Sequence, residues 1–334
     1  MDRLVADARR LADDVLWPQA ARADREGVRR EVVDVLAGAG LLGLDAPAPT
    51  VRAVQEALAG GCGATSFVVA QHRFPLLSIR DSANTALRDR WLPVLRSGQT
   101  LAAVAFSHLR RVGAPAVTAT RAPGGWRLDG TVAWTTSWGL ADVLLVAGVD
   151  PSSDRVVFAL IPARPQNGLT ARRLDLAVLG GTGTVALHLE GLAVADVEVV
   201  HIQNHAAWRD KDAGTTSNAT PASFGLLWRI CRQLAERDPR LAEELRLRGE
   251  ALRESAYLLI DQTPPSDELP ERIHIRAKML VLLQRAAAAY VTVSGGRGMD
   301  LEHPAQRLAR EAQFALVQAQ TPPVRSATLA ELGT

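Results

Sequence analysis

The chain has only two cysteines among its 334 residues, Cys62 and Cys231. They lie far apart and lack the spacing of a metal-binding motif, so we expect two buried apolar residues, a reducing cytoplasmic compartment and no metal site. No apolar run approaches the roughly 20 residues that span a bilayer. The charged, helical N-terminus is also unlike a signal peptide. A membrane protein is therefore not expected.

An excess of charge of one sign is lacking as well. Lysine and arginine total 38 against 36 acidic residues, which gives a formal net charge of +2. This balance favours neither nucleic acid nor an anionic membrane as a partner. The sequence also contains no GKT/S phosphate loop, HExxH, CxxC or GxSxG motif. The function must therefore be inferred from other patterns.

The sequence does contain two helical regions on either side of a β-rich one. Residues 1–99 carry apolar side chains at helical spacing. Residues 100–203 hold short apolar or alternating segments separated by glycine-containing turns, the pattern of an antiparallel barrel or sandwich. A polar stretch at 204–220 is expected to be a mobile linker, and residues 221–334 are again helical. We predict an α+β multi-domain protein with an N-terminal helical domain, a central antiparallel β-domain and a C-terminal helical bundle.

Within the β-rich region, Trp134 and Thr136 are prominent because aromatic residues make up only 4% of the chain. An indole and a hydroxyl can present a flat surface and a hydrogen-bond donor to a planar heterocycle. The alternative is a strand end whose tryptophans belong to the core. Ser107 and His108 end an earlier strand, at a place where side chains can reach a ligand.

Two further features each have two interpretations. His72 ends an apolar helical segment, where it is either a hydrogen-bonded core residue or a general base. Gly295-Gly-Arg-Gly298 follows a helix, so it is a helix-breaking turn, or a loop whose free backbone N–H groups hold a pyrophosphate. The residues alone leave both choices open.

The order of the regions and several strings resemble the acyl-CoA dehydrogenase family over most of the chain. Leu92-Pro-Val-Leu-Arg-Ser-Gly98 is similar to the family's YLPxLxSGE. Trp126-Arg-Leu-Asp-Gly130, followed by Trp134-Thr-Thr-Ser137, is similar to YxLNGxKxWITN. Closer to the C-terminus, Gly295-Gly-Arg-Gly298 resembles GGxGY, and His303-Pro-Ala-Gln-Arg-Leu-Ala-Arg-Glu-Ala312 resembles xPxxRxxRDA.

The resemblance implies a helical domain, a β-domain and a four-helix bundle, with FAD between the last two and completed by a neighbouring subunit. Matched position by position, Trp134 and Thr136 would face the isoalloxazine ring, and Ser107 would hydrogen-bond its pyrimidine edge. Gly295 and Gly296 would approach the pyrophosphate of the neighbour's FAD. Thr321 would lie near the adenine half.

The chain also departs from the family. Ala319 stands where many members carry the glutamate that removes the α-proton of the acyl thioester, and loss of such a base typically costs a factor of ~10² to 10⁴ or more. Gln320 replaces the adjacent glycine, and Gly113-Ala-Pro115 replaces GSD. The arginine and glutamine that grip the second FAD have no clear match. FAD binding that is weak or lost is therefore one expectation.

Three functions remain open. The first is an FAD-dependent oxidoreductase acting on an acyl thioester. The second is a flavin-dependent monooxygenase of the same fold, in which His72, Ser107 or His108 would manage protons. The third is a non-catalytic subunit of a hetero-oligomeric acyl-CoA dehydrogenase. The implied assembly is a homodimer or homotetramer, or a hetero-oligomer with a longer homologue.

Overall fold

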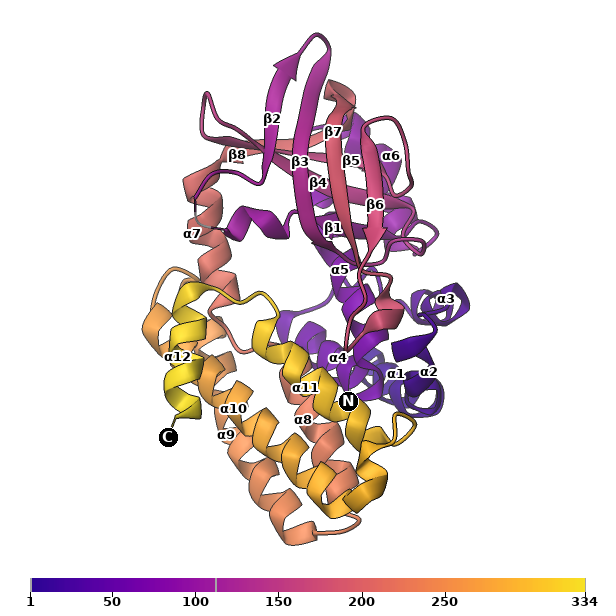
Figure 1. Ribbon diagram of the computed structural model, residues 1–334, viewed down its shortest axis with the longest axis vertical. Helices are drawn as coiled ribbons and strands as arrows, with labels where there is room; N and C mark the ends of the chain where they lie inside the picture. The colour runs from indigo at the N-terminus through magenta and orange to yellow at the C-terminus, as the bar shows by residue number, and fades with distance from the viewer. Residues whose placement is uncertain (1, 112, 334) are drawn as a thin grey trace.

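The computed structural model describes residues 2–111 and 113–333 and shows two helical regions and one sheet (Figure 1). The N-terminal helices pack against the C-terminal ones, and the sheet stands at one end of the molecule. The first region consists of α1 (Arg3–Leu11), the π-helix η1 (Ala12–Leu16), α2 (Trp17–Arg25), α3 (Arg30–Gly38), α4 (Ala48–Gly61), α5 (Gly63–Arg80) and α6 (Thr85–Arg96).

Several of these helices have a polar N-cap residue, whose side chain accepts a hydrogen bond from a first-turn backbone N–H that has no partner within the helix. Asp2 accepts from the Leu4 N–H at the start of α1, at 3.1 Å. Asn84 accepts from the Leu87 N–H at the start of α6, also at 3.1 Å. Each such cap typically contributes about 1 kcal/mol, so these residues help to set the first turns of α1 and α6.

The sheet has the strand order β6-β7-β3-β2-β4-β5-β8, with β1 beside β4. Its β1 and β2 run parallel to β4, so the expected purely antiparallel arrangement is wrong and the sheet is mixed. Parallel neighbours need a long crossover, and the β2–β3 hairpin supplies it between β1 and β4. The elements are β1 (Ala102–Ala105), η2 (Ser107–Arg110), β2 (Val117–Ala122), β3 (Gly125–Thr135), β4 (Val143–Asp150), β5 (Arg155–Pro162), β6 (Leu169–Arg173), η3 (Gly180–Thr182), β7 (Val185–Ala195), η4 (Asp196–Glu198) and β8 (Val199–Asn204).

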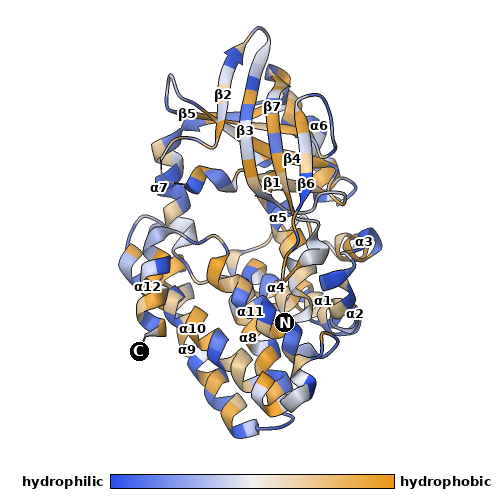
Figure 2. Cartoon of the chain, viewed as in Figure 1, coloured by the Kyte–Doolittle hydropathy of each residue, from blue (hydrophilic) through white to orange (hydrophobic). Residues whose placement is uncertain are grey.

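Side chains along β3 and β7 alternate between the core and solvent, and Figure 2 shows the matching alternation of hydrophobic and hydrophilic colour. By contrast, β4 and β5 are buried along almost their whole length. Strands buried on both faces are continuous apolar runs, whereas half-buried strands alternate. The sheet therefore has a covered centre and a more exposed flank.

The C-terminal region continues the chain with helices that run back along the N-terminal block (Figure 1). Among residues 2–111 and 113–333, no helix is long and apolar enough to cross a membrane. The elements are α7 (His205–Thr216), α8 (Pro221–Leu234), α9 (Pro239–Gln262), α10 (Leu269–Ser294), η5 (Gly295–Met299), α11 (Pro304–Val317) and α12 (Pro322–Leu332).

Residues 204–220, expected to be a mobile linker, instead contain helix α7. Asn204 caps it by accepting from a backbone amide of the first turn at 2.9 Å. Trp208 is buried, and Arg110 of η2 donates two hydrogen bonds of 2.8 Å to Asp212. The polar composition concealed this helix because only a narrow apolar face is covered.

The two helical regions meet most closely where α4 crosses α8. A Cβ at Gly225 would lie 2.0 Å from the backbone oxygen of Glu56, and one at Gly60 would lie 3.0 Å from the oxygen of Gly225. Because side chains at these positions would separate the helices, both glycines serve close helix packing.

We expect Gly225→Ala to destabilise the protein by roughly 3 kcal/mol, because the added methyl must push one helix backbone away from the other. The matched control is Gly38→Ala in α3, an exposed helical glycine with no described atom within 4 Å of an added Cβ. The control should be neutral, or stabilising by about 0.5–1 kcal/mol, because alanine is the better helix former. Urea unfolding followed by circular dichroism compares the two, and equal midpoints would contradict the packing argument.

Candidate functional site

The end of β3 presents an aromatic face beside η2. Trp134 is 55% exposed, an unusual state for a tryptophan in a chain with few aromatics. Ser107 Oγ donates to the Trp134 carbonyl at 3.2 Å, so the two predicted residues lie together. The interpretation of Trp134 as a core residue is therefore wrong, and its indole is available to a planar ligand.

A cluster of hydroxyl groups includes Thr136, two residues after Trp134 in the chain. Thr136 Oγ1 is 3.2 Å from Thr184 Oγ1, which is 2.9 Å from Thr182 Oγ1. Thr182 in turn donates to the Leu179 carbonyl at 2.7 Å. Since each hydroxyl has one proton, this order makes Thr184 donate to Thr182 and Thr136 donate to Thr184. Thr136 can then accept from a ligand, whereas donating to one requires its bond to Thr184 to break.

Two more hydroxyls in this segment are buried without a hydrogen-bond partner among the described residues: Thr135 Oγ1 and Ser137 Oγ. Ser137 also has a φ of 69°, a left-handed conformation that few non-glycine residues adopt. It is held there because its N–H donates to the Thr182 carbonyl at 2.8 Å. Unpaired buried polar groups and backbone strain both concentrate at functional sites.

His72 is not available as a base. Its Nε2 bonds the Leu95 carbonyl and its Nδ1 accepts from the Ala102 N–H, both at 3.0 Å. It lies in the middle of α5 and is 1% exposed. Burial lowers its pKa to about 4, so the ring is neutral at pH 7. The structural interpretation of this histidine is the correct one.

His108, in η2, is also buried, with 4% of its surface exposed. Neither of its ring nitrogens makes a hydrogen bond of standard length with a described residue. Burial lowers its pKa to about 4, although the nearby backbone of Ala147 offsets part of the fall. As a proton carrier near neutral pH it is therefore poorly suited.

The remaining predicted residues lie in two loops at opposite ends of α11 (Figure 1). Gly295 and Gly296 follow α10, and an added Cβ at either would meet no described atom within 4 Å. Ala319 and Thr321 lie in the loop between α11 and α12 and are half-buried. Ala319 has a φ of 46°, so this loop turns sharply at that residue.

Glu311 is a buried carboxylate that no sequence motif pointed to as a site residue. It lies at a small cavity that is enclosed by α4 and α5 on one side and by α8 and α11 on the other. The cavity measures about 70 Å³ and is lined by apolar residues, with Ser66, Ser223, Gln318 and Glu311 among its polar ones. Glu311 is 4% exposed, and its Oε1 accepts from Arg307 at 2.7 Å. Burial raises the pKa of Glu311. The only signal in the sequence was the i, i+4 spacing of an arginine and a glutamate, which usually marks an exposed pair.

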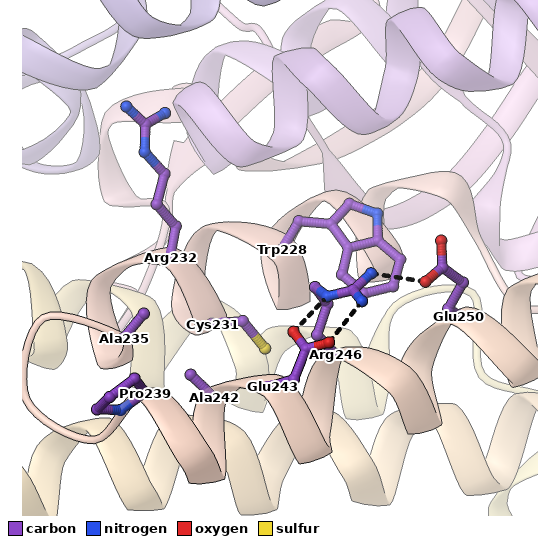
Figure 3. Close-up of a pocket in the computed structure, with 9 residues that line it drawn as sticks. All are labelled: Trp228, Cys231, Arg232, Ala235, Pro239, Ala242, Glu243, Arg246 and Glu250. Atoms are coloured by element: carbon purple, nitrogen blue, oxygen red, sulfur yellow. Dashed lines mark hydrogen bonds and ion pairs between the residues drawn. The ribbon is translucent and has the colours of Figure 1, made fainter.

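A larger hollow of about 300 Å³ lies between α8 and α9, away from all the predicted residues (Figure 3). One side of it is ionic, because Arg246 pairs with both Glu243 and Glu250, and the rest of the wall is mostly apolar. Burial raises the pKa of the Cys231 thiol to about 12, so that thiol is unreactive near neutral pH. The arrangement carries no evident chemistry.

Comparison with known proteins found similar sequences in one enzyme family. Residues 2–99 match the family model of the acyl-CoA dehydrogenase N-terminal domain. The mitochondrial short-chain specific acyl-CoA dehydrogenase of Homo sapiens is 26% identical over 204 residues, which are 56% of this chain and 50% of the human one. The chain thus spans about half the length of the curated relatives that it matches.

Solved structures extend the likeness to the whole chain. Butyryl-CoA dehydrogenase from Megasphaera elsdenii has a TM-score of 0.80 at 16% identity, covering 100% of this chain and 99% of that one. This is the acyl-CoA dehydrogenase fold. A glutaryl-CoA dehydrogenase from Mycobacterium smegmatis in complex with FADH2 shares the acyl-CoA dehydrogenase fold, with a TM-score of 0.80, 18% identity and coverage of 99% and 95%. The family model over residues 2–99 and the curated relatives point to the acyl-CoA dehydrogenase family, and the solved structures share its fold.

Acidification should destabilise the protein through the two buried histidines. The unfolded chain binds protons below a pKa of about 6.5, whereas the folded chain does so only near 4, so the free energy of unfolding falls as the pH drops between these values. At pH 5 we expect a loss of roughly 2 kcal/mol per histidine relative to pH 7.5. Urea titrations at the two pH values measure it.

His108→Leu provides the internal comparison, because it removes an ionisable ring that makes no standard hydrogen bond with a described residue. This variant should lose less stability on acidification than the wild type. A variant that follows the wild-type pH profile would show that His108 is not a source of the effect.

Proposed function

We propose that the protein is an FAD-dependent oxidoreductase that acts on an acyl thioester. The observation that carries the proposal is the exposed indole of Trp134 beside Ser107, backed by buried hydroxyls that lack partners among the described residues. A planar ring system with a polar edge suits an exposed indole that has a hydroxyl beside it. The name of one structural neighbour records a complex with FADH2, which supports a flavin as that ring system.

The residues present suit this cofactor. Trp134 would pack on the ring, while Ser107 and Thr136 would contact its polar edge. Gly295 and Gly296 have open space above their backbones, which suits close approach by a pyrophosphate, and Thr321 would lie near the adenine half. Bound FAD would supply the acceptor for the electrons removed from the substrate. Its affinity depends on how far these groups replace the family's missing arginine and glutamine.

The acyl side of the proposal rests on the cavity beside Glu311. Its volume of about 70 Å³ accommodates only a short group. The curated relatives are named as short-chain specific acyl-CoA dehydrogenases, which agrees with a short acyl substrate. We therefore place the end of a short acyl chain between α5 and α11.

Proton abstraction is the weak part of this active site. Ala319 offers a methyl group where many family members have a carboxylate, and His72 has both ring nitrogens occupied. This combination favours a second candidate, a non-catalytic subunit that shares FAD with a longer homologue. The monooxygenase is disfavoured for a separate reason. His72 and His108 are both buried, and their lowered pKa values make them poor proton donors or acceptors at a flavin.

The glycine loop after α10 is the surface at which we expect a second subunit to bind. Gly295 and Gly296 are exposed, and Met299 beside them is 59% exposed. An apolar side chain next to open glycine backbone suits burial against another chain. We propose a homodimer or homotetramer, or a hetero-oligomer with a longer homologue, and retain the cytoplasm as the proposed location.

An absorbance spectrum followed by anaerobic titration tests the function. The purified chain supplied with FAD should absorb near 450 nm, and addition of butyryl-CoA without oxygen should bleach that band. Absence of flavin from the isolated chain, but its presence after co-expression with a longer homologue, would favour the subunit. A chain that holds no flavin in either case would refute both.

Trp134→Ala should weaken FAD retention at least tenfold, because the ring would lose its aromatic partner, whose stacking is worth about 0.5–1.5 kcal/mol beyond area burial. Trp134→Phe should recover most of it. Leu258→Ala on α9 is the matched control, since Leu258 is 56% exposed but lies outside the site. Fluorescence titration with FAD measures the dissociation constants. Unchanged retention in Trp134→Ala would remove this indole from the cofactor site.

Ala319→Glu should raise the rate of flavin bleaching by butyryl-CoA about 10²-fold, because it supplies the absent proton acceptor. The backbone already has a positive φ there with a non-glycine residue, so the substitution adds little strain. Gln320→Glu places the same charge one residue away and should give no comparable gain. Stopped-flow absorbance at 450 nm measures both. Equal rates for wild type and Ala319→Glu would indicate that the pocket itself has diverged.

A further inference from the structure

The cavity beside Glu311 contains a polar group with an unused bonding position. Of its two carboxylate oxygens, Oε1 accepts from Arg307, but Oε2 has no partner among the residues that the structure describes. The side chain is 4% exposed, so water at the surface cannot satisfy it. A buried acceptor without a donor destabilises the fold, and more so when the group is charged.

The surrounding chain is built around this carboxylate. Gly63 begins α5, and a Cβ there would lie 2.6–3.0 Å from the Glu311 carboxylate carbon and oxygens. Any larger residue would thus displace the carboxylate, which lies over the helix start and lines the cavity together with Gly63. The partner Arg307 is 3% exposed and holds the other oxygen fixed. Glu311 is therefore held by Arg307 through one oxygen, while its other oxygen is buried and unpaired among the described residues at the edge of the cavity.

The rest of the cavity wall defines the kind of guest. Phe67 and Phe314 meet edge to face at 5.0 Å between ring centroids, and Leu179 and Leu226 add further apolar surface. A wall of this type binds a hydrocarbon segment of a ligand. The unpaired Glu311 oxygen calls for one hydrogen-bond donor at the end of that segment. Because Arg307 already balances the charge of Glu311, a neutral donor fits better than a cation.

We propose that this cavity receives the far end of a short acyl group that carries a terminal hydroxyl, and that Glu311 Oε2 accepts a hydrogen bond from it. This assignment rests on the proposed function and specifies its substrate class: short hydroxyacyl thioesters in preference to plain ones. A site with a dedicated hydrogen-bond partner discriminates strongly against an analogue that lacks the matching group.

The test uses the full chain loaded with FAD and pairs of CoA esters that differ only in a terminal hydroxyl or methyl. The pairs are 4-hydroxybutyryl-CoA with pentanoyl-CoA, and 3-hydroxypropionyl-CoA with butyryl-CoA. Isothermal titration calorimetry should show at least tenfold tighter binding of the hydroxylated member in one pair, as expected for a hydrogen bond to a charged acceptor. Equal binding within both pairs would overturn the proposal and leave the proposed function intact.

Glu311→Gln should keep the bond to Arg307 and lower the preference about tenfold, because a neutral amide replaces the carboxylate. If this variant is unstable, the double substitution Arg307→Leu with Glu311→Leu removes both charges together and should reverse the preference towards the methyl ester. Ser66→Ala, at the same cavity, is the control and should retain the preference. A preference unchanged by loss of Glu311 would overturn the assignment.

A second measurement separates this inference from the proposed function. If no CoA ester binds, the proposed substrate class is wrong. Crystals soaked with propan-1-ol then test whether the cavity binds a small alcohol at Glu311, with xenon as an apolar comparison. Propanol seated with its hydroxyl on Glu311 Oε2 would support the site. Xenon in the cavity without propanol, or neither, would refute it.

Discussion

The close contact between the backbones of α4 and α8 is the constraint on which the rest of the structure depends. It brings Glu56 near α9, where Arg253 and Tyr257 each donate to its Oε1 at 2.6 Å. One turn earlier on α4, Arg52 pairs with Asp261 at 2.6–2.9 Å. These partly buried pairs form only if the helices touch, so the two glycines set the geometry and the ion pairs fix its register. The walls of the small cavity beside Glu311 come from these same two helical regions.

Much of the architecture could be predicted from the sequence, because apolar periodicity reports which faces are buried. The same information failed for α7, whose buried face is narrow, and for the strand directions. Period-2 patterning shows that a segment is a strand but not which neighbour it joins. Parallel pairing of β1 with β4 depends on a chain crossover, which no local pattern encodes.

The candidate site was predicted unevenly for a comparable reason. Trp134 and Ser107 were found because an aromatic is rare in this chain and because strand ends present side chains. His72 was ambiguous, since its partners are the carbonyl of Leu95 and the amide of Ala102, and backbone groups leave no trace in a sequence. Glu311 was overlooked because its i, i+4 partner looks the same in the sequence whether the pair is exposed or buried.

The chain of hydrogen bonds that begins at Thr136 does not end at Leu179. The Leu179 N–H donates to Asp24 at 2.8 Å, and the other Asp24 oxygen accepts from Arg310 at 2.7 Å. Arg310 is the residue before Glu311. A continuous polar path thus runs from the end of a β-strand, through a loop and an N-terminal helix, to the helix that lines the cavity. Donors on both sides converge on the Asp24 carboxylate, so this one side chain holds the loop that carries Leu179 and the helix that carries Arg310 in a fixed relation to each other.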